Sequence, residues 1–101
     1  MTKEEIYAKA IAVYGHQAQM NMVTEECAEL IHVLNKYRRG IASAYDVHAE
    51  IVDVEIMLGQ LKLMLPLNDH ELITKYKLER LERYLEIASL NQETPPPDGA
   101  A

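Results

Sequence analysis

The sequence predicts an all-α protein built from four helices in a bundle-like arrangement. Turn-forming residues are scarce, because the chain of 101 residues has four Gly and four Pro, and three of the prolines stand together at 95–97. This scarcity before residue 95 argues against a β-sandwich or barrel. Apolar residues also recur at the three- and four-residue spacing of amphipathic helices up to about residue 90.

Capping signals predict the bounds of the first two helices. Thr2 followed by Glu5 is typical of a capping box and predicts a helix over about 3–14. Gly15 interrupts the chain, and a second helix is predicted over about 16–38. Basic residues at 36, 38 and 39, followed by Gly40, are typical of a helix C-terminus.

The third predicted helix is apolar over most of its circumference. Ser43 or Asp46 caps it, and Pro66 ends it after about residue 65. Its polar strip is narrow and contains only His48, Glu55, Gly59 and Lys62. A helix of this kind needs cover on several sides, so we expect a homodimer or homotetramer to complete the core.

The fourth helix and the tail complete the predicted domain organisation. Asn68 or Asp69 caps a helix that runs to about Leu90. Residues 1–90 are predicted to form one all-α domain. The segment 91–101, NQETPPPDGAA, lacks an apolar period and is predicted to be a disordered tail.

Charge and cysteine content argue against several classes of protein. The net charge of −6 disfavours binding to nucleic acid or to an anionic membrane surface. Cys27 stands alone, which excludes an intrachain disulfide and a Cys-rich zinc site. The sequence MTKEE is not a signal peptide, and no apolar run is long enough to span a membrane, so we expect a cytoplasmic protein.

The strongest chemical signal is the placement of five acidic residues. The second helix carries Glu25, Glu26 and Glu29, and the third carries Glu50 and Asp53. Two pairs, 26/29 and 50/53, have i,i+3 spacing and therefore share a helix face. These pairs lie in or beside the apolar stripes, where ionised carboxylates are costly unless cations compensate them.

Two such pairs on facing helices predict an all-oxygen site for hard divalent cations. Oxygen ligands without Cys favour Mg²⁺, with Mn²⁺ as the alternative, over Zn²⁺. Mg²⁺ commonly binds carboxylates together with substrate phosphates, which indicates a phosphate-bearing substrate. The ordinary alternative is a solvated acidic face. Di-iron chemistry is disfavoured, because Glu29 and His32 supply only half of its motif.

Two basic residues of the fourth helix lie on its apolar side. Lys77 and Arg80 have i,i+3 spacing, opposite the acidic face formed by Glu79, Glu82 and Glu86. One interpretation is a clamp for the phosphates of a metal-bound ligand. The alternative is that their stems cover a helix border or that they pair with acids.

The arrangement Glu25-Glu26-x-x-Glu29, twenty further residues and Glu50-x-x-Asp53 resembles the EExxE…ExxD signature of the MazG-like, all-α nucleoside triphosphate pyrophosphohydrolases. The resemblance extends over about residues 7–86. It includes the segments YGHQAQMNMVTEECAELIHVLNKYRRG, HAEIVDVEIMLGQLKLML and KYKLERLERYL, which are similar to small, phage-type members. His16 departs from the pattern, because an acidic or small polar residue is expected after Tyr-Gly.

The resemblance implies hydrolysis of (deoxy)nucleoside triphosphates to the monophosphate and pyrophosphate. It implies that Mg²⁺ is bound by the acids at four motif positions, which are Glu26, Glu29, Glu50 and Asp53. Glu25 would serve as a ligand, as a partner of a ligand or as the group that orients water, and Glu25 or Glu29 would take the proton. Lys77 and Arg80 would hold phosphates, and Gln19 would lie near the nucleotide or be a surface amide.

Two hypotheses for function follow. The first is Mg²⁺-dependent pyrophosphohydrolysis, in nucleotide housecleaning or in control of a nucleotide pool. The second is a non-catalytic helical module that binds a nucleotide or a partner, which the apolar third helix favours.

Overall fold

The computed structural model describes residues 1–91 and places four helices there, so the all-α prediction is confirmed. They are α1 (Lys3–Tyr14), α2 (His16–Arg38), α3 (Ala44–Met64) and α4 (His70–Asn91). The predicted tail, apart from residue 91, lies outside the described residues. Of the four helices in residues 1–91, none is both long enough and apolar enough to cross a membrane. The chain divides into two units, Met1–Pro66 and the part that starts at Leu67.

The first unit begins with a capped helix and a sharp change of direction. The Oγ1 atom of Thr2 accepts a hydrogen bond from the backbone N–H of Glu5 at 3.1 Å, as predicted for the start of α1. Gly15 has a φ of +93°, and its N–H donates to the carbonyl of Ile11 at 2.8 Å. This conformation is open to Gly and strained for other residues, and it separates α1 from α2.

The end of α2 is a Schellman motif. Gly40 has a φ of +78°, and its N–H donates to the carbonyl of Tyr37 at 3.0 Å. The N–H of Ile41 donates to the carbonyl of Lys36, also at 3.0 Å. These two bonds satisfy carbonyl groups that the end of a helix otherwise leaves without partners.

The start of α3 resolves the predicted choice between Ser43 and Asp46, because both take part. Ser43 is the N-cap, and its Oγ accepts from the N–H of Asp46 at 3.1 Å. The Asp46 carboxylate accepts from the N–H of Ser43 at 2.8 Å, which completes a capping box. The backbone hydrogen bond from Ser43 is the main reason why the pKa of Asp46 lies below its usual value.

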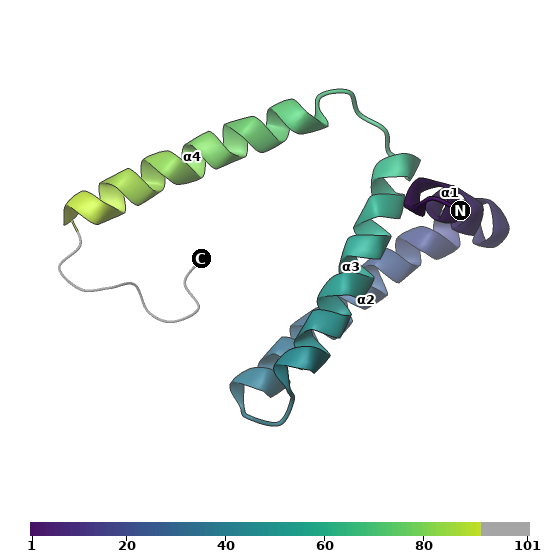
Figure 1. Ribbon diagram of the computed structural model, residues 1–101, viewed down its shortest axis with the longest axis horizontal. Coiled ribbons are helices and arrows are strands. Elements are labelled where there is room, and N and C mark those ends of the chain that lie inside the picture. Colours follow the sequence, from purple (N-terminus) through teal and green to yellow (C-terminus); the bar gives the residue numbers. More distant parts are fainter. Residues whose placement is uncertain (92–101) are drawn as a thin grey trace. The chain divides into compact units, whose positions relative to one another are not determined.

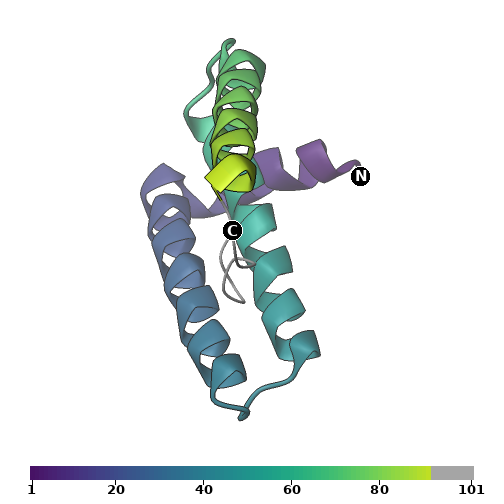
Figure 2. The same cartoon turned by 90° about the vertical axis from the view of Figure 1, so that its left-hand side faces the viewer.

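Helices α2 and α3 form an antiparallel hairpin, and α1 contacts both of them (Figures 1 and 2). The buried side chains of this unit are few. They are the apolar Ile11, Met57 and Met64 and the polar Gln19 and Gln60. The core therefore lies at the end of the hairpin where α1 packs.

Much of α3 is less buried than its apolar circumference predicts. Buried positions on α3 are limited to Met57, Gln60 and Met64. Four apolar residues at heptad-like spacing remain exposed, and we call them the α3 stripe. They are Tyr45, Val52, Ile56 and Leu63, with 81%, 52%, 38% and 45% of their surface exposed. The reason is that α1 and α2 pack against the other side of α3, where the buried residues lie.

Helix α4 is described by itself as the second unit. The carbonyl of Asp69 accepts from the N–H of Ile73 at 2.9 Å, so Asp69, one of the two predicted caps, occupies the N-cap position. The hydroxyl of Thr74 donates to the carbonyl of His70 at 3.0 Å. An i,i+4 ion pair joins Lys75 and Glu79 at 4.0 Å, on the predicted acidic face.

At Gly59, α3 packs closely against the Tyr7 side chain of α1. A Cβ atom built on Gly59 overlaps Cε2 of the Tyr7 ring and lies 3.1 Å from its Cδ2. The absence of a side chain at Gly59 therefore lets the aromatic ring of Tyr7 rest directly on the backbone of α3.

Gly59→Ala is expected to lower the free energy of unfolding. Overpacking against a ring costs about 1–3 kcal/mol, and over most of this range the cost is larger than the gain of about 1 kcal/mol in helix propensity. In a Tyr7→Ala background the ring is gone, and the same change should stabilise by about 1 kcal/mol. Urea denaturation of the four proteins forms a double-mutant cycle. Stabilisation by Gly59→Ala in both backgrounds would contradict the close packing.

Candidate functional site

The α2–α3 hairpin brings three of the motif acids together. Glu26 and Glu29 come from α2 and Glu50 comes from α3, and one carboxylate oxygen of each lies within 4.8 Å of the other two. The i,i+3 spacing places the first two on one face of α2, and the pairing of α2 with α3 brings Glu50 close to them. We call these three residues the acidic group.

Two oxygens of the acidic group are shielded from solvent and unsatisfied. Glu26 and Glu50 are half-buried, whereas Glu29 is exposed. The Oε2 atoms of Glu26 and Glu50 have no hydrogen-bond partner within the part of the chain that the structure describes. A shielded carboxylate oxygen without a donor or a cation is unfavourable, so the arrangement favours binding of a positive group.

The electrostatics of the acidic group oppose full ionisation. Loss of hydration raises the pKa of both Glu26 and Glu50 above the ordinary value of 4.5. The negative charges of Glu29 and Asp53 raise both further. Within residues 1–66, no Lys, Arg or His forms an ion pair with these acids within 4.0 Å. No cation of the first unit therefore pairs directly with the acidic group.

Asp53 and Glu25 lie beside the acidic group rather than in it. Asp53 is exposed, although its helical angle predicts a position within the apolar arc of α3. Its carboxylate acts on Glu26 and Glu50 through its negative charge. Glu25 is also exposed, and it borders a depression on the α1 side.

This α1-side depression has a volume of about 560 Å³ and is bordered mainly by α2. Its lining residues are Tyr14, Ala18, Gln19, Asn21, Met22, Glu25 and Met57. It combines an aromatic ring and thioethers with amide groups, a mixture that fits an organic ligand.

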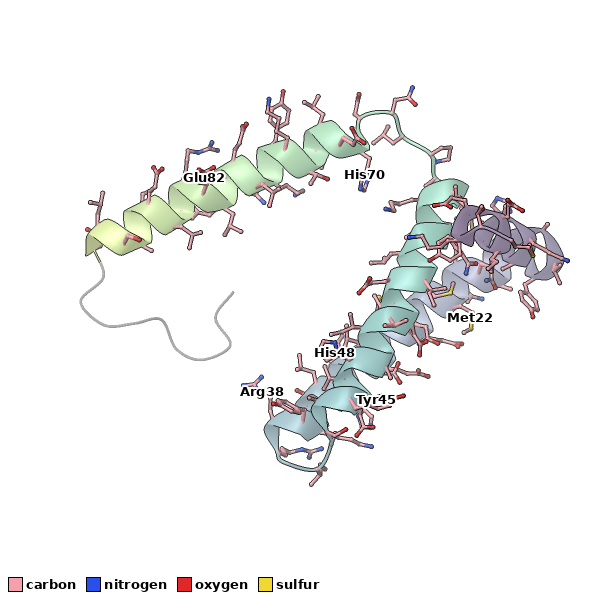
Figure 3. The ribbon with its side chains drawn as sticks, in the orientation of Figure 1. Met22, Arg38, Tyr45, His48, His70 and Glu82 are labelled. Atoms are coloured by element: carbon pink, nitrogen blue, oxygen red, sulfur yellow. The ribbon has the colours of Figure 1, made fainter. Side chains whose placement is uncertain are left out.

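The two ends of the hairpin can be followed in Figure 3, where Met22 lies toward the α1 end and Arg38 lies toward the turn.

Gln19 is buried and takes part in a short chain of polar contacts. Its Nε2 donates to Oε1 of Gln60 at 2.7 Å, and Nε2 of Gln60 contacts Sδ of Met57 at 3.7 Å. The interpretation of Gln19 as a surface amide is therefore wrong. Gln60 was not predicted as a site residue, although it lies seven residues after Asp53 on the row of α3 that also carries Met57.

A second depression lies on the turn side of the acidic group and has a volume of about 310 Å³. Its lining residues are Val33, Lys36, Ile41, Ala42, Asp46, Ala49 and Glu50. Glu50 thus belongs to both the acidic group and this turn-side depression. The acidic group therefore lies between two hollows along the same hairpin.

The predicted phosphate-binding residues belong to the second unit. Lys77 and Arg80 both lie on α4, three residues apart and on one side of the helix. Because α4 is described by itself, their role toward the acids stays a prediction.

The donor set of the acidic group suits a hard divalent cation. The three oxygens lie within 4.8 Å of one another, and adjacent ligands of a Mg²⁺ ion would be about 3 Å apart. The three carboxylates would therefore have to draw closer together to share one ion. Orphaned oxygens, negative charge and the absence of sulfur in the group all fit Mg²⁺ or Mn²⁺.

Comparison with known proteins does not extend these observations. No protein family, curated protein or solved structure that was compared with the chain matches it.

The raised pKa values predict how stability depends on pH without metal. The folded state holds its protons more tightly than the unfolded state, so stability falls as pH rises from about 4.5 through the folded-state pKa values. Glu50→Gln should therefore stabilise the protein at pH 7.5 in EDTA, with the gain vanishing near pH 4. Urea denaturation across this range measures it. Glu55→Gln, at an exposed position of α3 outside the group, is the control, and equal effects of both variants would contradict the prediction.

Proposed function

We propose that this chain is a Mg²⁺-dependent nucleoside triphosphate pyrophosphohydrolase that converts (d)NTP to (d)NMP and pyrophosphate. The observation that carries the proposal is the acidic group, in which motif acids of two helices meet with two shielded, unpartnered oxygens. The resemblance of the double motif to MazG-like enzymes supplies the reaction. Housecleaning of nucleotides or control of a nucleotide pool in the cytoplasm is the corresponding role.

Glu26, Glu29 and Glu50 would hold the metal directly, and Asp53 would complete the set from the adjacent turn of α3. When bound, Mg²⁺ supplies charge neutralisation for phosphate oxygens and lowers the pKa of coordinated water. The half-buried positions of Glu26 and Glu50 favour a firmly held cation, because attraction is stronger where water is partly excluded.

Glu25 is the better of the two candidates for the base. It lies outside the acidic group and is exposed, so its oxygens are free to accept a proton from water. Glu29, the other candidate, has an oxygen within the acidic group and is better suited to holding the cation. The position of Glu25 on the border of the α1-side depression also puts it next to space for a substrate.

The α1-side depression is the proposed place for the nucleoside. Gln19 supports it from within, because its hydrogen bond to Gln60 fixes the wall of the depression and joins α2 to α3. Lys77 and Arg80 are proposed to bind phosphates, as the resemblance implies. Their charges would offset those of the triphosphate.

The proposed reaction predicts a specific product pattern. With Mg²⁺, the protein should release pyrophosphate and monophosphate in equal amounts from at least one member of a panel of NTPs and dNTPs. Glu50→Gln and Asp53→Asn should each lower kcat by at least roughly 10- to 100-fold, because a lost ligand costs at least as much as a lost supporting group. Chromatography of nucleotides with a coupled pyrophosphate assay measures both.

Glu55→Gln is the matched control for this assay, since it neutralises an exposed acid of the same helix. Release of orthophosphate in place of pyrophosphate would refute the bond assignment. A wild-type protein that turns over no nucleotide while remaining folded would favour the non-catalytic helical module.

We also propose that a second copy of the chain covers the α3 stripe, giving a homodimer or a homotetramer. Only three apolar side chains are buried in the described part of the chain, which is a small core for helices of this length. The stripe runs along α3 at positions 45, 52, 56 and 63, a spacing that suits packing against another helix.

Ile56→Glu is expected to shift the protein toward monomers and to lower its thermal stability, because it places a charge in the proposed interface. Sedimentation equilibrium over a range of concentrations measures the assembly. Lys62→Gln makes the same change in net charge at an exposed position of α3 outside the stripe, and it should leave the assembly intact. A wild-type protein that is monomeric throughout the range would refute the proposed interface.

A further inference from the structure

Lys36 is the cation of the first unit that shares a hollow with the acidic group. It lies on α2, two turns after Glu29, and therefore about 10 Å farther along the helix toward the turn. Glu25, Glu29 and Lys36 fall on one strip of α2, at i, i+4 and i+11. Lys36 is half-buried and lines the turn-side depression together with Glu50.

The ammonium of Lys36 is available to a ligand. Within residues 1–66 it forms no ion pair with a carboxylate within 4.0 Å. Asp46, the other acid of the same depression beside Glu50, already accepts the N–H of Ser43 at 2.8 Å. The low pKa of Asp46 is caused mainly by hydrogen bonds from Ser43, and the charge of Lys36 is the smallest contribution.

The two depressions differ in chemistry, so each of them suits a different part of a ligand that lies along the hairpin. The α1-side depression offers the Tyr14 ring, the Asn21 amide and two thioethers, groups that contact a nucleoside. The turn-side depression offers a flexible ammonium, a group that binds phosphate. A ligand whose reacting bond lies over the acidic group must extend into both hollows.

We propose that Lys36 binds the distal phosphates of the nucleoside triphosphate, the part that leaves as pyrophosphate. The inference rests on the proposed function and deepens it by assigning an orientation to the substrate. In the cleavage, the oxygen of water forms a bond to the α phosphorus, and the bond from that phosphorus to the bridging oxygen breaks. The electron pair stays on the departing pyrophosphate, next to Lys36, and the proton of water passes to a carboxylate.

Equilibrium binding of pyrophosphate tests this assignment without any turnover. Titration calorimetry is carried out on the full chain at constant free Mg²⁺, with pyrophosphate and, separately, with dTMP. Lys36→Met keeps the length of the side chain and removes the charge, and it should weaken pyrophosphate binding by about tenfold or more. Lys36→Arg should retain most of the affinity. The affinity for dTMP should not change in either variant.

Arg39→Gln is the matched control, because it removes a positive charge near the same helix end. Arg39 lines a different hollow, together with His32, Asn35 and Arg38. It should leave pyrophosphate binding unchanged. If Lys36→Met melts early, Lys36→Gln replaces it, and circular dichroism checks that each variant is folded.

Three results would overturn the assignment. They are a wild-type protein that does not bind pyrophosphate, a Lys36→Met protein that binds it as tightly as wild type, and an equal loss of dTMP and pyrophosphate binding. A protein that cleaves no nucleotide but binds pyrophosphate through Lys36 would refute the proposed function and keep the phosphate site. If the protein cleaves the α–β bond and Lys36→Met binds pyrophosphate as tightly as wild type, the proposed function stands and the phosphate site at Lys36 is refuted.

Discussion

The pairing of α2 with α3 holds together carboxylates that repel one another, and the candidate site depends on this constraint. Burial and the neighbouring charges of Glu29 and Asp53 raise the pKa of Glu26 and of Glu50. Ionisation of these two carboxyl groups therefore lowers the stability of the hairpin. The interactions that stabilise the hairpin against this repulsion lie at its two ends. At one end α1 contacts α3, whose Met57 and Met64 are buried, and at the other a capping box and a Schellman motif hold the turn. The cation of the proposed function would relieve this repulsion and so stabilise the hairpin.

Much of the fold could be predicted because its helix ends are encoded locally. Thr2, Ser43 with Asp46 and Gly40 each act within a few residues of their own position, and the structure places them at helix ends as expected. The grouping of Glu26 with Glu29 follows equally from helical spacing. These features need no knowledge of how one helix sits on another.

The features that sequence reasoning missed depend on register between helices. The bond from Gln19 to Gln60 joins residues 41 positions apart, and no local pattern specifies that pairing. The exposure of Asp53 could not be predicted either, because its helical angle places it near Glu50 while the cover supplied by α2 decides its burial. Likewise, Lys36 enters the turn-side depression because the turn brings residues 41, 42 and 46 beside it.

The five-residue turn between α2 and α3 has a consequence for insertions: an extra residue in the turn has a different effect from an extra residue inside α2. An extra residue between Ile41 and Ala42 falls after the last Schellman bond and before Ser43, so both helix ends can keep their own hydrogen bonds. An extra residue inside α2, between Glu29 and Lys36, rotates everything beyond it by about 100° and takes the lysine off the strip of acids. Natural variation in the length of this hairpin should therefore collect at its tip or occur as whole helical turns added to both arms.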